Sequence, residues 1–424
     1  MIVLLATRSF LYSQFNDTIT EKEVSRIIHY LASDSLKGRG NGRPELLKAA
    51  KFIGEEFRKN NLAPLPGLLS YFIPFRPFGG RKNVVIDNLL WNGTALNKDD
   101  FIYLHPDPGN YFPKTIHDFK VIKLDKPFSE DILEQFSNDS SSLLIWTDKK
   151  QADGANIFPD SIKIPFRGIK DNRLLAYAET RPYDLLLTGN ESFYSLVEYN
   201  LVGMLPGKTK PGEVIIFSAH YDHEGVYGRT GDSILNGAND NASGTTALLL
   251  LAQYFSKRND NDRTILFCAF AAEELGLLGS NDLLSYLTLK NIIAGINIEM
   301  IGVPHYGKNR IFITGEKYSD LPRILEKNLK NTGIRVRSEP DEKKQLFQRS
   351  DNYPFALKGV PFHTIMASDD DDACYHQPCD EIKRIDIANM IRIIKAIAFS
   401  ARRLVSGEVT PRRINPSEVE IKKL

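Results

Sequence analysis

Acidic and histidine side chains follow several apolar segments of the chain, where strands are expected to end. His220 and Asp222 come directly after EVIIFSA, and the pair Glu273-Glu274 follows RTILFCAFAA. Glu299 ends the apolar run IIAGINI, where an isolated ionised carboxylate would be strongly destabilised by burial. A carboxylate in such a position requires either a bound proton or a neighbouring cation.

Two further positions join this set. Asp240 lies in NGANDNASG, a loop that opens a predicted helix, and His376 follows the predicted strand VPFHTIM after an acidic loop. Each residue alone has an ordinary structural role, since an aspartate before a helix usually caps it. Together they would meet at the carboxyl edge of one sheet, where open α/β folds form their sites. Imidazole and carboxylate are ligands that zinc prefers, so the pattern predicts a zinc site.

The elements that must position these residues alternate along the C-terminal half. From about residue 196, strand-like apolar segments alternate with helical ones such as SGTTALLLLAQYFSK and DIANMIRIIKAIAFSARRLV. This alternation predicts an α/β fold, a three-layer α/β/α sandwich with a mostly parallel, mixed central sheet. Residues 80–195 instead contain short β-like runs such as FKVIKL and SSLLIWT, which predict a β-rich insertion.

The bulk composition excludes several classes of protein. The 424 residues carry a formal net charge of +1, with 42% apolar and 25% charged residues, so no charge excess indicates nucleic-acid binding. We find no apolar run of about 18 residues and expect no transmembrane segment. The N-terminal MIVLLA resembles part of an export signal without the preceding basic residues. We therefore expect a periplasmic or extracellular protein; the alternative is an apolar tail packed on the fold.

Six motifs in a fixed order carry a family resemblance: HYDH, NDNASG, AAEELGLLGS, NIEMIG, SDNYPF and YHQPCDE. Their order resembles that of the co-catalytic zinc exopeptidases, which include secreted bacterial aminopeptidases, glutamate carboxypeptidases and glutaminyl cyclases. The resemblance covers roughly residues 20–75 and 196–405. We therefore expect an N-terminal part of the catalytic domain at 1–79 and the main catalytic domain at 196–406, on either side of the β-rich module at 80–195. The segment 407–424, with Pro411 and Pro416, is expected to form a loosely held tail. The insertion resembles in position the protease-associated insert of some members.

The resemblance implies two Zn²⁺ per chain. Asp240 would bridge both ions, His220 and Glu274 would complete one site, and Glu299 and His376 would complete the other. Three ligand carboxylates, two divalent cations and one bridging hydroxide sum to zero charge. A bound cation would thus explain why a carboxylate ends the apolar run IIAGINI.

Other residues near these ligands receive supporting roles from the same resemblance. Glu273 would be the general base rather than a ligand. Asp222 would lie behind His220 and fix its tautomer, and His223 would also lie behind the ligands. The family further implies a cis peptide bond at Asp240–Asn241.

The expected activity is hydrolysis of N-terminal residues from peptides through a metal-bridging hydroxide and a glutamate base. The alternatives are a single-zinc glutaminyl cyclase, a carboxypeptidase, and a non-catalytic scaffold on the same fold. Arg349 is a candidate contact for a substrate carboxylate or carbonyl group, or else a surface ion-pair partner. The acidic run 368–372 could attract a cationic amino terminus, bind calcium, or form a solvated loop.

Cys374 and Cys379 bracket the predicted ligand His376. Their spacing permits a tight loop, and some secreted family members look similar here, so we expect a disulfide that pins this loop. Such a bond would indicate an oxidising compartment. The alternative is a pair of free thiols.

Glu299 departs from the family pattern, since most relatives look to have aspartate at this position. We expect Glu299 to remain a ligand at the same ion as His376, with this site the weaker of the two. The rival interpretation is that the longer acid marks a different reaction or a single-metal site.

Overall fold

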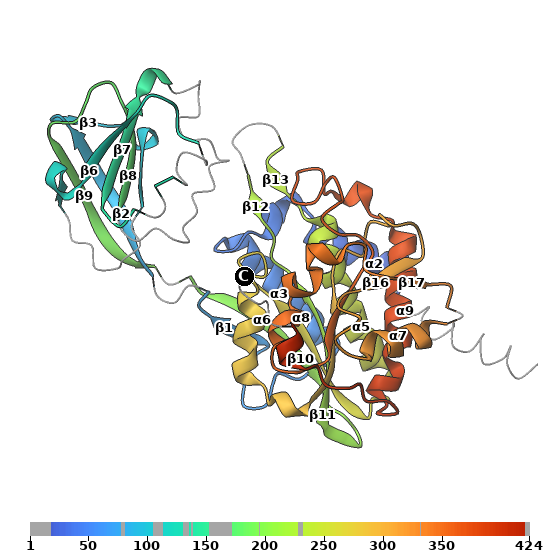
Figure 1. Ribbon diagram of the computed structural model, residues 1–424. Helices are drawn as coiled ribbons and strands as arrows, with labels where there is room; N and C mark the ends of the chain where they lie inside the picture. Colours follow the sequence, from blue (N-terminus) through green and yellow to red (C-terminus); the bar gives the residue numbers. More distant parts are fainter. Residues whose placement is uncertain are drawn as a thin grey trace, which may run out of the picture. The chain divides into compact units, whose positions relative to one another are not determined.

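The computed structural model describes residues 18–77, 81–104, 113–129, 135–136, 139–151, 172–194, 196–227, 232–330 and 332–419. The chain forms two compact units (Figure 1). The larger unit comprises Met1–Pro77 and Val197–Leu424, and Phe78–Leu196 form the inserted unit. The apolar N-terminal segment MIVLLA lies outside the described residues.

The larger unit is built on one eight-stranded sheet. Its strand order is β1 (Phe72–Phe75), β10 (Glu198–Leu205), β14 (Arg263–Phe270), β11 (Lys210–His220), β15 (Ile292–Ile298), β18 (Phe362–Met366), β16 (Arg310–Ile313) and β17 (Arg335–Arg337). The central strands β14, β11, β15 and β18 run parallel, and β16 runs parallel to β17. The pairs β1–β10, β10–β14 and β16–β18 are antiparallel. The predicted mixed, mostly parallel sheet is confirmed.

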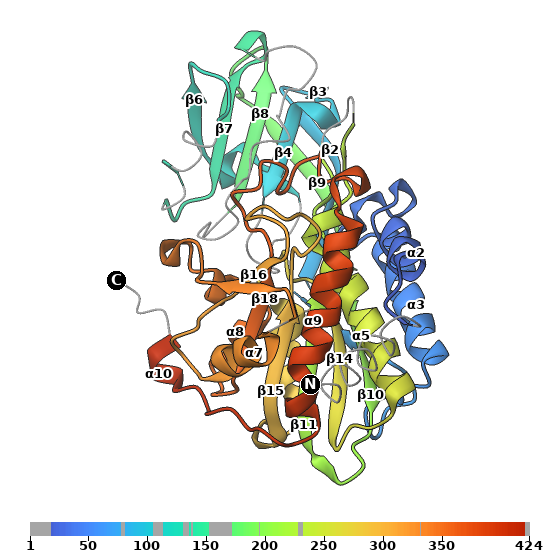
Figure 2. The same cartoon turned by 90° about the vertical axis from the view of Figure 1, so that its right-hand side faces the viewer.

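Helices cover both faces of this sheet (Figure 2). One face carries α2 (Glu21–Leu31), α3 (Pro44–Lys59), α5 (Gly244–Arg258), α7 (Leu321–Leu329) and α9 (Ile387–Val405), and the other carries α6 (Leu278–Leu283) and α8 (Asn352–Ala356). In β14, Ile265 and Phe267 pack in one apolar core while Leu266 and Cys268 pack in the other. Because both faces are covered, the strand is continuously apolar from Ile265 to Phe270 rather than alternating. The predicted three-layer sandwich is therefore confirmed.

Local sequence explains where two helices begin. Pro44 occupies the first turn of α3, where its missing N–H costs no hydrogen bond. Gly244 opens α5, and a Cβ atom there would lie 2.2 Å from the carbonyl oxygen of Ile298. Only glycine allows α5 to approach β15 this closely, so the loop before α5 is held against the end of that strand.

The segment 407–419 differs from the loosely held tail expected from the sequence. The buried guanidinium of Arg263 donates to the carbonyl oxygens of Leu404 and Val409, at 2.8 and 2.6 Å. Arg413 donates to the carbonyl oxygen of Ile292, and Ile414 is buried. The segment ends in the short helix α10 (Pro416–Val419). The proline-rich composition therefore marks an irregular but packed strap rather than a free tail.

The inserted unit is β-rich and has its own core. One sheet contains β3 (Thr94–Ala95), β2 (Arg81–Trp91), β9 (Leu185–Tyr194) and β5 (Lys114–Thr115); the other contains β4 (Phe101–Leu104), β8 (Arg173–Ala178), β7 (Leu143–Asp148) and β6 (Lys120–Leu124). Trp91 and Trp146 meet edge to face, with ring centroids 6.1 Å apart, within this core. In the part of the chain that the structure describes, no helix has the length and apolar character needed to cross a bilayer.

Candidate metal centre

The predicted ligands lie at one edge of the central sheet. β14, β11, β15 and β18 are adjacent and parallel, so their carboxyl ends lie together. His220 is the last residue of β11, and Glu299 directly follows β15. Asp240 lies in the irregular helical turn Ala238–Ser243, which precedes α5. The loop after β14 supplies Glu274 and the loop after β18 supplies His376, so five separate segments converge on this edge.

Asp240 lies at the centre of the cluster. Its Oδ1 is 3.3 Å from Nε2 of His220, and its Oδ2 is 3.2 Å from Nε2 of His376. Burial alone would raise the pKa of Asp240, but the two imidazoles hold it well below its usual range. The bond Asp240–Asn241 is cis, as the family resemblance implied. One carboxylate therefore faces two different histidines.

Glu274 and His376 form the second part of the cluster. Oε2 of Glu274 is 3.3 Å from Nε2 of His376, and its Oε1 is 2.9 Å from Nδ1 of His223. Burial lowers the pKa of His376, but the carboxylates of Asp240 and Glu274 outweigh it and raise that pKa to about 10. The carboxylate beside His376 is thus Glu274, which differs from the expected pairing of His376 with Glu299. Glu274 is directed there by its second oxygen, which His223 holds.

Asp222 organises the backbone behind the ligands. His220 Nδ1 lies 3.2 Å from the main-chain carbonyl oxygen of Asp222 and 3.7 Å from its carboxylate. The tautomer of His220 is therefore set mainly by that carbonyl group. The Asp222 carboxylate accepts the backbone N–H groups of Glu273 and Glu274, at 3.2 and 3.3 Å. It also accepts the amide of Asn41 at 2.7 Å, so it holds the loop after β14 in place.

Glu273 and Glu299 line the same cavity as His220 and Asp240. Burial raises the pKa of Glu273 well above its ordinary value, and the nearby Glu299 raises it further. Oε1 of Glu299 accepts hydrogen bonds from Ser350 Oγ at 2.6 Å and from the Asn297 amide at 2.9 Å. These two hydrogen bonds fix the carboxylate through Oε1, so that Oε2 could bind a metal ion.

The donor spacing fits divalent zinc. Two donors about 2.0–2.1 Å from one tetrahedral ion lie about 3.3 Å apart. The three nitrogen–oxygen pairs that link Asp240 to His220, Asp240 to His376 and Glu274 to His376 measure 3.2–3.3 Å. Carboxylates this close together also require compensating positive charge. The residues around Asp240 therefore suit zinc.

A cavity of about 400 Å³, its open mouth included, lies beside these ligands. Its apolar wall consists of Met300, Leu346 and Met366, which belong to one small apolar cluster. Tyr375 also lines the cavity, and its ring stacks on His376 with centroids 3.9 Å apart. The cavity therefore combines an apolar wall with a tyrosine hydroxyl close to the ligands.

The acidic run after β18 is paired with cations. Lys344 Nζ lies 2.7–3.2 Å from carboxylate oxygens of Asp369, Asp370 and Asp371. Arg349, which lines the cavity, also pairs with Asp370 at 2.7 Å. These cations compensate much of the negative charge that was considered for a calcium ion or an amino terminus. Arg349 lies at the cavity mouth as part of an ion pair.

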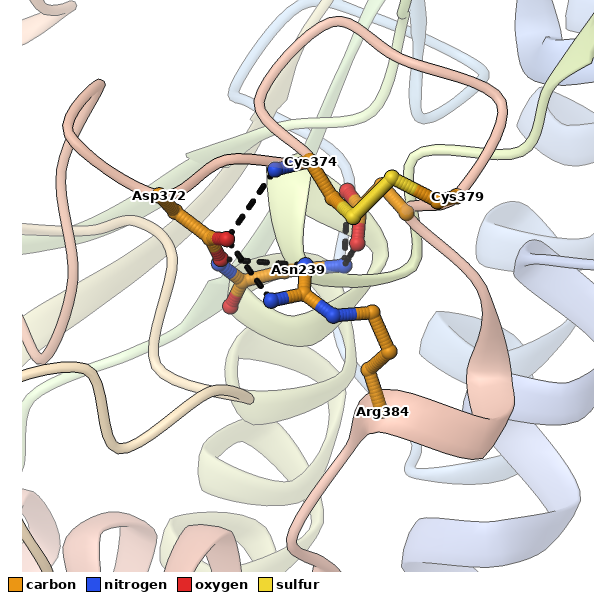
Figure 3. Close-up of a disulfide and its surroundings, with 6 residues drawn as sticks. Asn239, Asp372, Cys374, Cys379 and Arg384 are labelled. Atoms are coloured by element: carbon orange, nitrogen blue, oxygen red, sulfur yellow. Dashed lines mark hydrogen bonds and ion pairs between the residues drawn. A yellow bond between two sulfur atoms is a disulfide. The ribbon is translucent and has the colours of Figure 1, made fainter.

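The loop that carries His376 is closed by the predicted disulfide. Cys374 and Cys379 are bonded across the base of this loop (Figure 3). Beside it, Asp372 accepts the backbone N–H of Cys374 and pairs with Arg384 at 2.7 Å. His376 itself has a φ of 52°, a left-handed conformation that few side chains adopt freely. The disulfide and the ion pair hold the loop in this shape.

Three contributors were missed from the sequence. Arg39, fully buried, donates to the carbonyl oxygens of Tyr221, Asn236 and Gly237. It thereby ties the loop after β11 to the loop that carries Asp240. Arg39 lies in the segment LASDSLKGRG, where no sequence signal indicated those acceptors.

Asp380 and Glu224 are the other two. The Asp380 carboxylate accepts the backbone N–H groups of Asn239 and Asp240, at 3.0–3.1 Å. Glu224 Oε1 lies 3.5 Å from Nδ1 of His376. Both contacts join segments that are far apart in sequence, and only the folded loops reveal them.

Comparisons with known proteins agree with this geometry. Residues 200–401 match the family model described as peptidase family M28. Aminopeptidase YwaD of Bacillus subtilis is 25% identical over 267 residues, which cover 61% of this chain and 55% of that protein. Leupeptin-inactivating enzyme 1 of Streptomyces exfoliatus is 30% identical over 239 residues, half of each chain. The chain thus spans about half the length of these curated relatives.

Solved structures extend the likeness in fold. The zinc aminopeptidase BSAP of Bacillus subtilis aligns with a TM-score of 0.62 at 18% identity, covering 92% of this chain and 95% of that one. The aminopeptidase of Aneurinibacillus sp. strain AM-1 aligns with a TM-score of 0.56 at 15% identity, over 97% of this chain and 98% of its own. At these identities the match establishes the shared fold.

Proposed function

We propose that the protein is a two-zinc aminopeptidase that releases N-terminal residues from peptides, on the premise that residues 200–401 match the model of peptidase family M28. The observation that carries the proposal is the geometry of Asp240, whose two carboxylate oxygens face His220 and His376 separately. A carboxylate that faces a different imidazole through each oxygen would suit a pair of cations, one on either side.

The described residues divide into two ligand groups. Asp240, Glu274 and His376 would hold one ion, and Asp240, His220 and Glu299 would hold the other. When bound, paired zinc ions lower the pKa of a shared water and polarise the scissile carbonyl group. Proton transfer and hydrogen bonding to the substrate would be carried out by side chains of the protein.

Glu273 is the proposed general base. Its carboxylate faces the cavity and lies in the same tight group as His220 and Glu274. It would take the proton of the attacking water as a general base and then deliver that proton to the leaving amine as a general acid. The Tyr375 hydroxyl would donate a hydrogen bond to the substrate carbonyl oxygen as negative charge develops there.

The cavity wall indicates the first side chain of the substrate. Met300, Leu346 and Met366 offer flexible apolar surface and no unpaired charge, which favours residues such as leucine, methionine or phenylalanine. The Arg349–Asp370 pair at the mouth would contact the peptide beyond the first residue. We therefore propose a preference for apolar over charged N-terminal residues.

We also propose that the protein is exported. The Cys374–Cys379 disulfide supports this location, because such bonds persist in oxidising compartments.

A substrate panel tests the proposed activity. Purified full-length protein loaded with two equivalents of zinc is assayed on aminoacyl p-nitroanilides, N-acetylated analogues, peptides blocked at the carboxyl end and glutaminyl peptides. We expect hydrolysis of leucyl and methionyl substrates and no turnover of the acetylated analogues, because a free amino terminus is required. Cyclisation of glutaminyl peptides with one bound zinc, or cleavage only at carboxyl termini, would overturn the proposal.

A further inference from the structure

The segment His220–Glu224, which follows β11, sends consecutive side chains into both halves of the metal centre. His220 faces Asp240 Oδ1, and Asp222 holds the loop after β14. The next two residues face the other half. Neither His223 nor Glu224 takes part in the proposed hydrolysis itself.

His223 is fully buried and contacts a ligand directly. Its Nδ1 lies 2.9 Å from Oε1 of Glu274, and since an ionised carboxylate only accepts hydrogen bonds, Nδ1 donates. Among the described residues, its Nε2 has no hydrogen-bond partner. The ring is wedged against Gly237, where a Cβ atom would lie 2.5 Å from His223 Cδ2. Its hydrogen bond is therefore with Glu274, whose other oxygen faces His376, and Asp240 Oδ2 lies farther from the same nitrogen, at 3.9 Å.

Glu224 contacts the second ligand of the same group. Its Oε1 lies 3.5 Å from Nδ1 of His376, on the side of the ring opposite Nε2. Nε2 is the nitrogen that faces Asp240 and Glu274. A carboxylate at Nδ1 keeps the proton there and leaves the Nε2 lone pair directed at the ion.

The backbone of this pair is firmly held. The N–H of His223 donates to the carbonyl oxygen of Arg39 at 3.2 Å, and Gly40 forms a bridge with His223. Gly225 packs closely on Gly40, since a Cβ atom added to Gly225 would lie 3.1 Å from the Cα atom of Gly40. The two side chains therefore project from a fixed strap rather than from a free loop.

We infer that His223 and Glu224 are positioning residues for the ion held by Asp240, Glu274 and His376, and do not act on the ion held by His220 and Glu299. The inference rests on the two-ion arrangement of the proposed function. His223 fixes one oxygen of Glu274 so that the other faces the ion, and Glu224 orients the ring of His376. The segment His220–Glu224 therefore contributes separately to the affinity for each of the two ions.

The expected sizes differ between the two residues. Groups that orient metal ligands typically change metal affinity by about 10–100-fold. His223 is buried and close to its partner, so its loss should reach the upper part of that range. Glu224 is 41% exposed and 3.5 Å away, so its loss should cost about tenfold.

The test measures zinc binding in the absence of substrate. Full-length protein is stripped of metal and titrated with zinc against a chromophoric chelator, which resolves two stepwise affinities. Variants His223→Leu and Glu224→Ala remove the contacts, and His223→Asn and Glu224→Gln retain a donor or an acceptor. Anomalous scattering from crystals grown with one zinc equivalent identifies which ion each variant loses.

Two controls bracket the measurement. Ser350→Ala removes a donor to Glu299 and should weaken only the ion beside His220. Glu342→Gln removes a surface carboxylate that pairs with Lys317 and should change neither affinity. Thermal unfolding of each metal-free variant shows whether it still folds.

We expect His223→Leu and Glu224→Ala to weaken the same ion, and the conservative variants to recover at least part of that affinity. Equal weakening of both ions, no change in either, or loss only of the ion beside His220 would each overturn the inference, as would wild-type protein that binds a single zinc. The inference does not depend on turnover: protein that binds two ions as expected but cleaves no peptide would refute the proposed activity alone.

Discussion

Replacing Glu299 by aspartate tests how the carboxylate of this proposed ligand is held. The carboxylate is anchored through Oε1 by Ser350 and Asn297, at 2.6 and 2.9 Å. Aspartate is shorter by one carbon–carbon bond, about 1.5 Å. The shorter side chain cannot both keep these two hydrogen bonds and reach an ion beside His220. We expect it to follow the ion, because an uncompensated cation is the costlier outcome.

The magnitude follows from the partners left behind. A hydrogen bond to a charged group contributes about 1.5–3 kcal/mol. Ser350 Oγ and the Asn297 amide each retain Thr364 Oγ1, at 2.8 and 3.3 Å, so neither is left unpaired. Because both donors keep a partner, the loss should fall below the sum of two such bonds, to about 1.5 kcal/mol, which corresponds to about a tenfold change in affinity or rate.

The assay compares zinc content, zinc affinity and leucyl p-nitroanilide turnover of Glu299→Asp and Glu299→Gln with the wild type. Aspartate should keep two zinc ions and lose about tenfold, while glutamine should lose the ion beside His220 because the charge is gone. Glu339→Asp is a matched control, since Glu339 accepts one backbone N–H from Gly315 away from the centre. Full zinc affinity in Glu299→Gln would show that Glu299 is not a ligand, and complete loss of the ion in Glu299→Asp would refute the reasoning on its hydrogen bonds.

Three further outcomes are expected. Glu273→Gln should keep about two zinc ions per chain but lower turnover at least about a hundredfold, the scale of general acid–base catalysis; loss of zinc by that variant would instead make Glu273 a ligand. The double variant Cys374→Ser/Cys379→Ser should release the ion at His376 faster to a chelator without changing release of the other, and alkylation before reduction should label neither cysteine of the wild type; equal acceleration of both phases would argue against a local role. Burial lowers the pKa of His363 to about 4 against about 6.5 in the unfolded chain, so its contribution to stability is complete above pH 6.5 and falls by about 3 kcal/mol as the pH drops to 4. Denaturant unfolding of wild type and His363→Gln at pH 7 and pH 4.5 measures this difference, and parallel losses in both proteins would contradict it.

The sheet could be predicted from the sequence because burial leaves a strong pattern. β14 is continuously apolar from Ile265 to Phe270, and the charged residues that follow it and β15 have few explanations other than a site. Parallel neighbours place those strand ends together, so the strand pattern predicts a cluster at this edge, whereas the ligand set itself was implied by the family resemblance. The partition of ligands between two ions did not follow. It depends on which oxygen of Glu274 faces His376, and that is set by loop geometry.

Other contacts were beyond prediction for a related reason. Arg39 binds main-chain carbonyl groups, which every residue possesses, so no side-chain pattern marks its partners. The strap 407–419 was expected to be loose because it is rich in proline and charge. It is held by the buried Arg263 and by Arg413, whose backbone acceptors leave no trace in the sequence.

The insertion affects the order in which the parts of the nascent chain can fold. β1 pairs with β10 across the whole inserted unit, and Arg39 awaits the carbonyl group of Tyr221, 182 residues later. At about 5–20 residues per second, a ribosome needs about 10–40 s to deliver that acceptor. The sheets of the inserted unit pair only among residues 81–194, so that unit can close first. Meanwhile the apolar faces of α2 and α3 remain uncovered on the nascent chain, which makes these two helices natural sites for chaperone binding during synthesis.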